Sequence, residues 1–131
     1  MANKIELTKS VNAVPFGADR DAVISAFGQP LRSFNKSPMS KAKTDAFEGF
    51  NVYYTSEYKL EAVEFTKGVE LIVNGHSVPW DYSALKAWML TMDPNAQVES
   101  DGITSAVSGI GMFAVGNDVQ SLLFAASDYY A

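Results

Sequence analysis

Carboxylates are the most abundant reactive side chains in this chain of 131 residues, which contains 15 Asp and Glu residues, one histidine and no cysteine. Paired carboxylates can hydrolyse a glycosidic bond or bind calcium. Here they gather in two stretches of sequence, Glu57–Glu70 and Asp93–Asp101. The spacing in the second stretch is not that of an EF-hand loop. We therefore interpret these acids as solvated surface residues and predict no metal site.

Nucleophilic catalysis has little support in the sequence. His76 is the one histidine, and it follows the hairpin-forming pair Asn74-Gly75, which predicts an exposed position. Its neighbour Ser77 would point to the opposite face of a strand, so the two cannot form a catalytic pair. The sequence has neither a G-x-G-x-x-G loop nor a P-loop. We predict a protein that is not an enzyme and needs no cofactor, with a small hydrolase using paired carboxylates as an alternative.

Tyrosines accompany the acids of the first stretch. Protein interfaces favour tyrosine because it offers a large contact area and keeps a polar tip. Since neighbouring residues of a strand point to opposite faces, one of Tyr53 and Tyr54 should lie on an open sheet surface. One glutamate nearby should lie at a solvent edge or carry a raised pKa in a cavity. The predicted protein-binding residues are Tyr53, Tyr54, Tyr58, Glu57, Glu61 and Glu64.

The net charge of −5 is distributed unevenly along the chain. Residues 1–44 contain seven Lys and Arg against three acids, a net of +4, and residues 45–131 contain three against twelve, a net of −9. An acidic surface of this kind can steer a basic protein partner. The basic charges concentrate in segment 31–44, which predicts a long solvated loop. Phe34 is the one aromatic residue of this segment, so we do not expect nucleic-acid binding. The expected partner is a basic protein, with a homodimer as an alternative.

Runs of β-branched and aromatic residues predict the strands. Residues 49–54 and 60–65 form a predicted hairpin, and residues 69–73 extend it as a third strand of the same meander. A second hairpin is predicted from residues 109–115 and 119–125, and an opening strand begins near Ile5.

Two helices are predicted, each with an aspartate at its start. Asp19 can cap a helix over residues 20–27, and Asp81 can cap a helix that ends at Met92. We expect Trp88 to be the centre of the core, because one face of the second helix carries the apolar residues Leu85, Trp88, Met89 and Met92.

The second half of the sequence repeats the order of the first: a capped helix, a polar segment and a hairpin that begins with glycine. This order suggests two tandem helix–loop–hairpin units, residues 16–78 and 79–131, within a single domain of residues 1–131. The predicted fold is α+β, with one antiparallel sheet of about six to eight strands and two helices on one face.

The segment from Phe16-Gly17 to Gly28-Gln29-Pro30, followed by a hairpin, resembles the repeat unit of small bacterial helix-plus-sheet proteins. This group includes the tandem-repeat β-lactamase inhibitory proteins, small lipoproteins of outer-membrane assembly, and immunity proteins. The chain lacks the lipidated cysteine of the lipoproteins and the disulfides of the secreted inhibitors. The resemblance implies a non-catalytic protein that binds another protein through an open sheet face and long loops.

The N-terminus lacks the apolar run of a signal peptide, and no segment approaches membrane-spanning length. We expect a cytoplasmic protein without a membrane partner, although a mature secreted chain would show the same features. The leading functional prediction is an inhibitor, an immunity protein or an anti-defence factor. The alternative is a small-ligand binder with a cavity between sheet and helices.

Overall fold

The strands form two β-sheets in the computed structural model, which describes residues 2–127, 129 and 130. In the larger sheet, all neighbouring strands are antiparallel. Its eight strands, in spatial order, are β10 (Gln97–Glu99), β11 (Gly102–Ser105), β12 (Ile110–Val115), β13 (Asp118–Ala125), β7 (Leu60–Thr66), β6 (Phe50–Tyr54), β5 (Thr44–Phe47) and β4 (Arg32–Phe34).

The smaller sheet combines the first strands of the chain with the segment that follows β7. Its five strands, in spatial order, are β3 (Val14–Pro15), β2 (Ser10–Val11), β1 (Asn3–Glu6), β8 (Leu71–Val73) and β9 (His76–Ser77). The Asn74-Gly75 hairpin is confirmed, with φ angles of 47° and 85° at its two residues. The prediction that residues 69–73 extend the first meander was wrong, because β8 pairs in parallel with β1.

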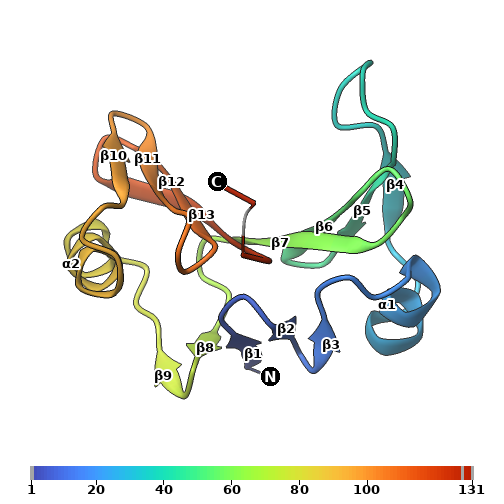
Figure 1. Cartoon of the computed structure of the whole chain (residues 1–131), viewed down its shortest axis with the longest axis horizontal. Helices are drawn as coiled ribbons and strands as arrows, with labels where there is room; N and C mark the ends of the chain where they lie inside the picture. The colour runs from blue at the N-terminus through green and yellow to red at the C-terminus, as the bar shows by residue number, and fades with distance from the viewer. Residues whose placement is uncertain (1, 128, 131) are drawn as a thin grey trace.

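The two helices are α1 (Arg20–Phe27) and α2 (Tyr82–Met92). Figure 1 shows them on the same side of the eight-stranded sheet, with the five-stranded sheet between them. The opposite side of the large sheet, which we call the outer face, carries no helix in the described part of the chain. The α+β class and the eight antiparallel strands are as predicted. The layer that packs against the large sheet differs from the predicted pair of helices, because most of it is the five-stranded sheet.

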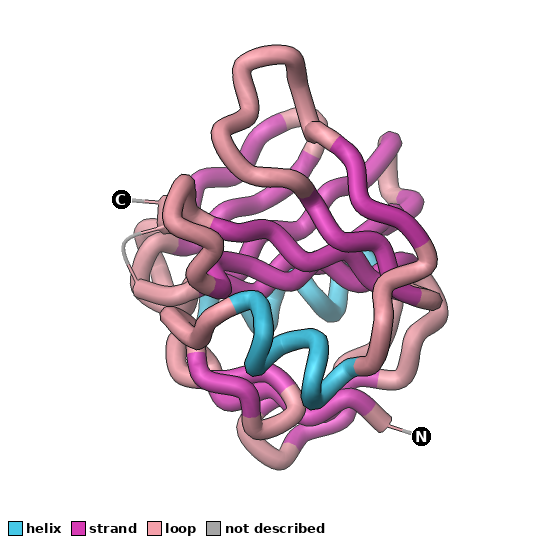
Figure 2. The backbone as a smooth tube through the Cα atoms, turned by 90° about the vertical axis from the view of Figure 1, so that its right-hand side faces the viewer, coloured by secondary structure: helices cyan, strands magenta, loops and turns pink. Residues whose placement is uncertain are grey.

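The strand order of the large sheet is symmetrical about its centre. Strands β4–β7 follow α1 along the chain, strands β10–β13 follow α2, and the two sets join where β7 pairs with β13. Segment 31–44, which we predicted as a loop, contains strand β4 and the first residue of β5. The backbone of the remaining loop, residues 35–43, projects from this end of the sheet (Figures 1 and 2).

The core lies between the two sheets and is closed at its ends by the helices. Leu85 and Met89 of α2 have 0% exposed surface, whereas Trp88 is only partly buried. Trp88 lies at the edge of the core and lines a surface pocket with His76 and Pro79. The prediction that Trp88 is the centre of the core was therefore wrong. Leu85 and Met89 are the residues of α2 that are fully buried in the core.

The two predicted helix caps have different outcomes. The Asp81 carboxylate accepts a hydrogen bond of 2.9 Å from the Ala84 amide, so this cap is confirmed. Asp19 occupies the N-cap position of α1, but its side chain makes no capping hydrogen bond. It forms an ion pair with Lys59 of the neighbouring turn instead. A contact between distant parts of the chain thus replaces the local one.

Candidate functional site

Adjacent tyrosines on β6 point to opposite faces of the large sheet. Tyr54 faces the core, is 7% exposed and donates a 2.8 Å hydrogen bond to Asp45. The Asp45 carboxylate is fully buried and also accepts from Arg20 Nε and Nη2, at 2.8 and 3.0 Å, and from Ser33 Oγ at 2.6 Å. Burial opposes ionisation of Asp45, but these hydrogen bonds hold its pKa below the ordinary value. Tyr54 is therefore part of a buried polar network and does not lie on the outer face.

Tyr53 lies on the outer face. Its hydroxyl donates to Glu64 Oε1 on β7, and Ser121 Oγ on β13 donates to Glu64 Oε2 at 2.7 Å. This network joins three neighbouring strands at the centre of the sheet. Partial burial, followed by the hydrogen bond to Glu64, raises the pKa of Tyr53 above its ordinary value. The phenol therefore stays neutral and donates at physiological pH.

A β-bulge on β7 determines where Glu61 lies. Tyr53 pairs with Ala62 and Tyr54 pairs with Leu60, which leaves Glu61 as the extra residue. Leu60 consequently packs in the core and Ala62 on the outer face, although regular strand alternation would place the two residues on the same face. Glu61 is partly buried, and desolvation raises the pKa of its carboxyl group while Lys36 opposes the increase. Of the two alternatives expected for a glutamate in this region, a solvent edge or a raised pKa, Glu61 corresponds to the second.

The C-terminal tyrosines fold back onto the outer face. Tyr129 and Tyr130 pack with Tyr53 against a small apolar cluster formed by Ala62, Leu123 and Ala125. Their rings meet edge to face with centroids 4.9 Å apart. Tyr130 comes so close to β12 that a Cβ atom on Gly111 would lie 2.0 Å from its hydroxyl oxygen. We did not select Tyr129 or Tyr130 from the sequence, although a glycine inside an apolar strand is a signal of such close packing.

The basic loop reaches the same region of the sheet. The Lys36 ammonium lies 4.5 Å from the centroid of the Tyr53 ring, in a cation–π contact. Lys36, Tyr53, Glu61 and Tyr129 line a pocket of about 310 Å³ together with other residues of the loop and the β6–β7 turn. We call this hollow the tyrosine pocket. Its walls thus combine aromatic rings and a carboxylate with the chain's own ammonium group.

Of the six predicted binding residues, the structure brings Tyr53, Glu61 and Glu64 together. Tyr54 is in the core, and the other two, Tyr58 and Glu57, belong to the turn between β6 and β7. The Tyr58 hydroxyl accepts a 3.0 Å hydrogen bond from the Lys43 amide, which attaches the end of the basic loop to this turn. Glu57 is exposed at the turn.

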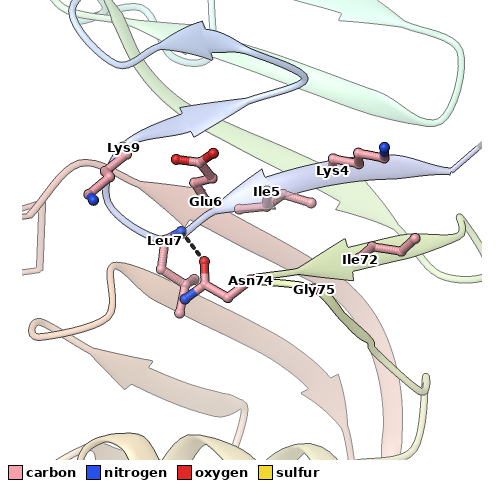
Figure 3. Close-up of a pocket in the computed structure, with 8 residues that line it drawn as sticks. All are labelled: Lys4, Ile5, Glu6, Leu7, Lys9, Ile72, Asn74 and Gly75. Carbon is pink, nitrogen blue, oxygen red and sulfur yellow. Dashed lines mark hydrogen bonds between the residues drawn. The ribbon is translucent and has the colours of Figure 1, made fainter.

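A larger hollow of about 730 Å³ lies on the small sheet, at the junction of β1 and β8. Figure 3 shows Lys4 and Ile72 at one end and Lys9 and Leu7 at the other, and the Leu7 amide donates to Asn74 Oδ1 at 3.0 Å. The charged groups at its rim, Lys4, Glu6 and Lys9, are exposed. This hollow is therefore a surface feature of one sheet, unlike the predicted ligand cavity between sheet and helices.

A second buried polar network lies at the C-terminal end of α2. Buried Asp93 accepts from Ser105 Oγ at 2.8 Å, and Ser105 Oγ accepts from Ser108 Oγ at 2.7 Å. This network fixes the end of α2 to β11. His76 is exposed on β9, as predicted. In residues 2–127, 129 and 130, no group of three or more histidines and acids is arranged to hold a metal ion.

The chain matches no protein-family model, no curated protein and no solved structure in our comparisons. Within the described residues, neither helix has the length and apolar character needed to cross a membrane.

Proposed function

We propose that this chain is a non-catalytic protein-binding protein that engages its partner through the outer face of the eight-stranded sheet. The observation that carries the proposal is the Tyr53–Glu64–Ser121 network at the centre of that face, beside the tyrosine pocket. Figure 1 shows the helices and the small sheet on the opposite side. Tyrosines with fixed orientation make good binding anchors, because little side-chain entropy is lost when a partner covers them.

The charge of the chain indicates the kind of partner. Glu64 lies at the centre of the outer face and Glu61 in the tyrosine pocket beside it. Residues 45–131 carry a net charge of −9, from three basic and twelve acidic residues. A partner with a basic patch would be steered toward this surface. An inhibitor, an immunity protein or an anti-defence factor works in this way, by covering a basic functional surface of its target.

The proposal includes the two tandem units predicted from the sequence, residues 16–78 and 79–131. Two units that each contribute four strands would give one wide sheet, in keeping with the observed strand order. A wide, open sheet provides the large contact area that a stable protein complex needs.

Site-specific photocrosslinking in the native host tests the proposed face. A photoreactive residue at Phe113, 42% exposed on β12, or at Asn51 on β6 reports on the outer face. The same residue at Ala87, exposed on α2, is the matched control. We expect one crosslinked protein from Phe113 and Asn51 and none from Ala87. Crosslinks from Ala87 alone, or only to a second copy of the chain, would overturn the proposal.

The kinetics of the purified complex provide the second test. If acids of the outer face steer the encounter, association slows as salt rises while dissociation changes little. Tyr53→Ala should accelerate dissociation by an amount worth about 2 kcal/mol if the ring is an anchor. Tyr53→Phe retains the ring and should have a smaller effect. A salt-independent association rate together with a neutral Tyr53→Ala variant would contradict this role of the outer face.

A further inference from the structure

The tyrosine pocket combines the features of a site for an organic cation. The Tyr53 ring provides a π face, and its phenol is held in place by the hydrogen bond to Glu64. Tyr129 forms another part of the wall; it packs against the same apolar cluster as Tyr53 and meets the Tyr130 ring edge to face. Aromatic walls attract ammonium groups most strongly where water is partly excluded.

Glu61 provides the negative charge. The bulge places its carboxylate in the pocket wall, where the side chain is partly desolvated. Within the described residues, the Glu61 carboxylate accepts no hydrogen bond and forms no ion pair. A partly buried carboxylate without a fixed partner gains most from a cation placed beside it.

An ammonium group already occupies this environment. Lys36 places its Nζ over the Tyr53 ring, and its charge acts on Glu61. Lys36 belongs to the loop of residues 35–43, which projects above the sheet (Figure 2). The loop is bonded internally, through Ser37 and Ser40, and is attached at its end through Lys43 and Tyr58. Lys36 takes part in no strand pairing, so replacement of its ammonium group in the pocket would break no hydrogen bond between strands.

We propose that the tyrosine pocket binds the ammonium group of a lysine side chain of the partner, and that Lys36 is the internal occupant that this lysine replaces. The identity of the lysine donor rests on the proposed protein-binding function, whereas the ammonium specificity of the pocket rests on its geometry. A lysine is favoured because the pocket already accommodates one, with its ammonium group over the Tyr53 ring and its charge acting on Glu61.

Titration with a small probe tests the pocket without a partner. The probe is Nα-acetyl-lysine methylamide, and its neutral counterpart is Nα-acetyl-norleucine methylamide; amide chemical shifts of Tyr53 and Glu61 report binding. Lys36→Met removes the internal ammonium and should tighten probe binding about fivefold. Lys43→Met removes a charge from the same loop outside the pocket and should leave the affinity unchanged.

Variants of the walls complete the experiment. In the Lys36→Met background, Tyr53→Ala and Glu61→Gln should each weaken lysine binding about fivefold or more, and Tyr53→Phe should retain most of it. Equal shifts from the norleucine probe, or an unchanged affinity in Lys36→Met, would overturn the inference. If photoreactive residues on the outer face crosslink a partner but the pocket does not bind the lysine probe, only the present inference fails. If the probe binds but crosslinks arise only from α2, the proposed function fails and the pocket chemistry stands.

Discussion

Replacing Asp45 by alanine removes the acceptor at the centre of a buried network. Four hydrogen bonds are lost, two from Arg20 and one each from Ser33 and Tyr54. The three donor residues differ in whether water can replace the lost acceptor. Ser33 is exposed and can turn to water, and the Arg20 side chain is 36% exposed, so water satisfies part of its guanidinium. The hydroxyl of Tyr54, a residue with 7% exposed surface, is left without its acceptor.

These differences determine the expected loss of stability. A buried hydroxyl without a hydrogen-bond partner lowers stability by about 1–3 kcal/mol. Breaking a buried ion pair lowers it by about 3–5 kcal/mol when both charges are desolvated. Because Arg20 reaches solvent, we expect Asp45→Ala to lower the free energy of unfolding by about 3 kcal/mol. Adding Tyr54→Phe removes the stranded hydroxyl, so the double variant should recover about 1 kcal/mol relative to Asp45→Ala.

Urea denaturation of the two single variants and the double variant at neutral pH measures these energies. The pH dependence adds an independent check, since the network lowers the pKa of Asp45 in the folded state. Its contribution is present above the unfolded-state pKa of about 4 and is lost as the pH falls through the lower folded-state value. Asp45→Ala should therefore flatten the acid limb of the stability profile. A loss below about 1 kcal/mol, with an unchanged acid limb, would refute the reasoning.

Three further predictions follow from packing. Gly111→Ala would place a Cβ 2.0 Å from the Tyr130 hydroxyl oxygen, so Tyr130 should leave the sheet and become more reactive to nitration; unchanged reactivity in peptide mapping would contradict this placement. Leu85→Ala should cost about 3 kcal/mol in urea melts and Trp88→Ala clearly less, because only Leu85 is fully buried; the reverse order would be inconsistent with the structure. Limited trypsin digestion should cut first in the projecting loop, at Lys36, Lys41 or Lys43. First cleavage at Lys59 or Lys67, which form ion pairs, would show instead that the loop is held in place.

Short-range chemistry made several features predictable from the sequence. The Asn74-Gly75 turn, the Asp81 cap and the hairpin of residues 109–125 each depend on residues a few positions apart. The opposite orientation of Tyr53 and Tyr54 follows from strand alternation, which directs one of two adjacent tyrosines to each face of the sheet. The prediction of one antiparallel sheet of about six to eight strands came from the repeated order of helix and hairpin, and the larger sheet has eight strands.

Contacts between distant segments decided the rest. The parallel pairing of β8 with β1 joins residues about seventy positions apart, and no local signal marks it. Asp19 binds Lys59 instead of capping α1, and the single bulge residue Glu61 changes which face Leu60 occupies. Of the six residues proposed from the sequence, Tyr53, Glu61 and Glu64 lie together in the structure. Only tertiary packing could bring Lys36 over Tyr53 and Tyr129 beside Glu61, because these residues meet through a loop and a chain end whose positions are set by the completed sheet.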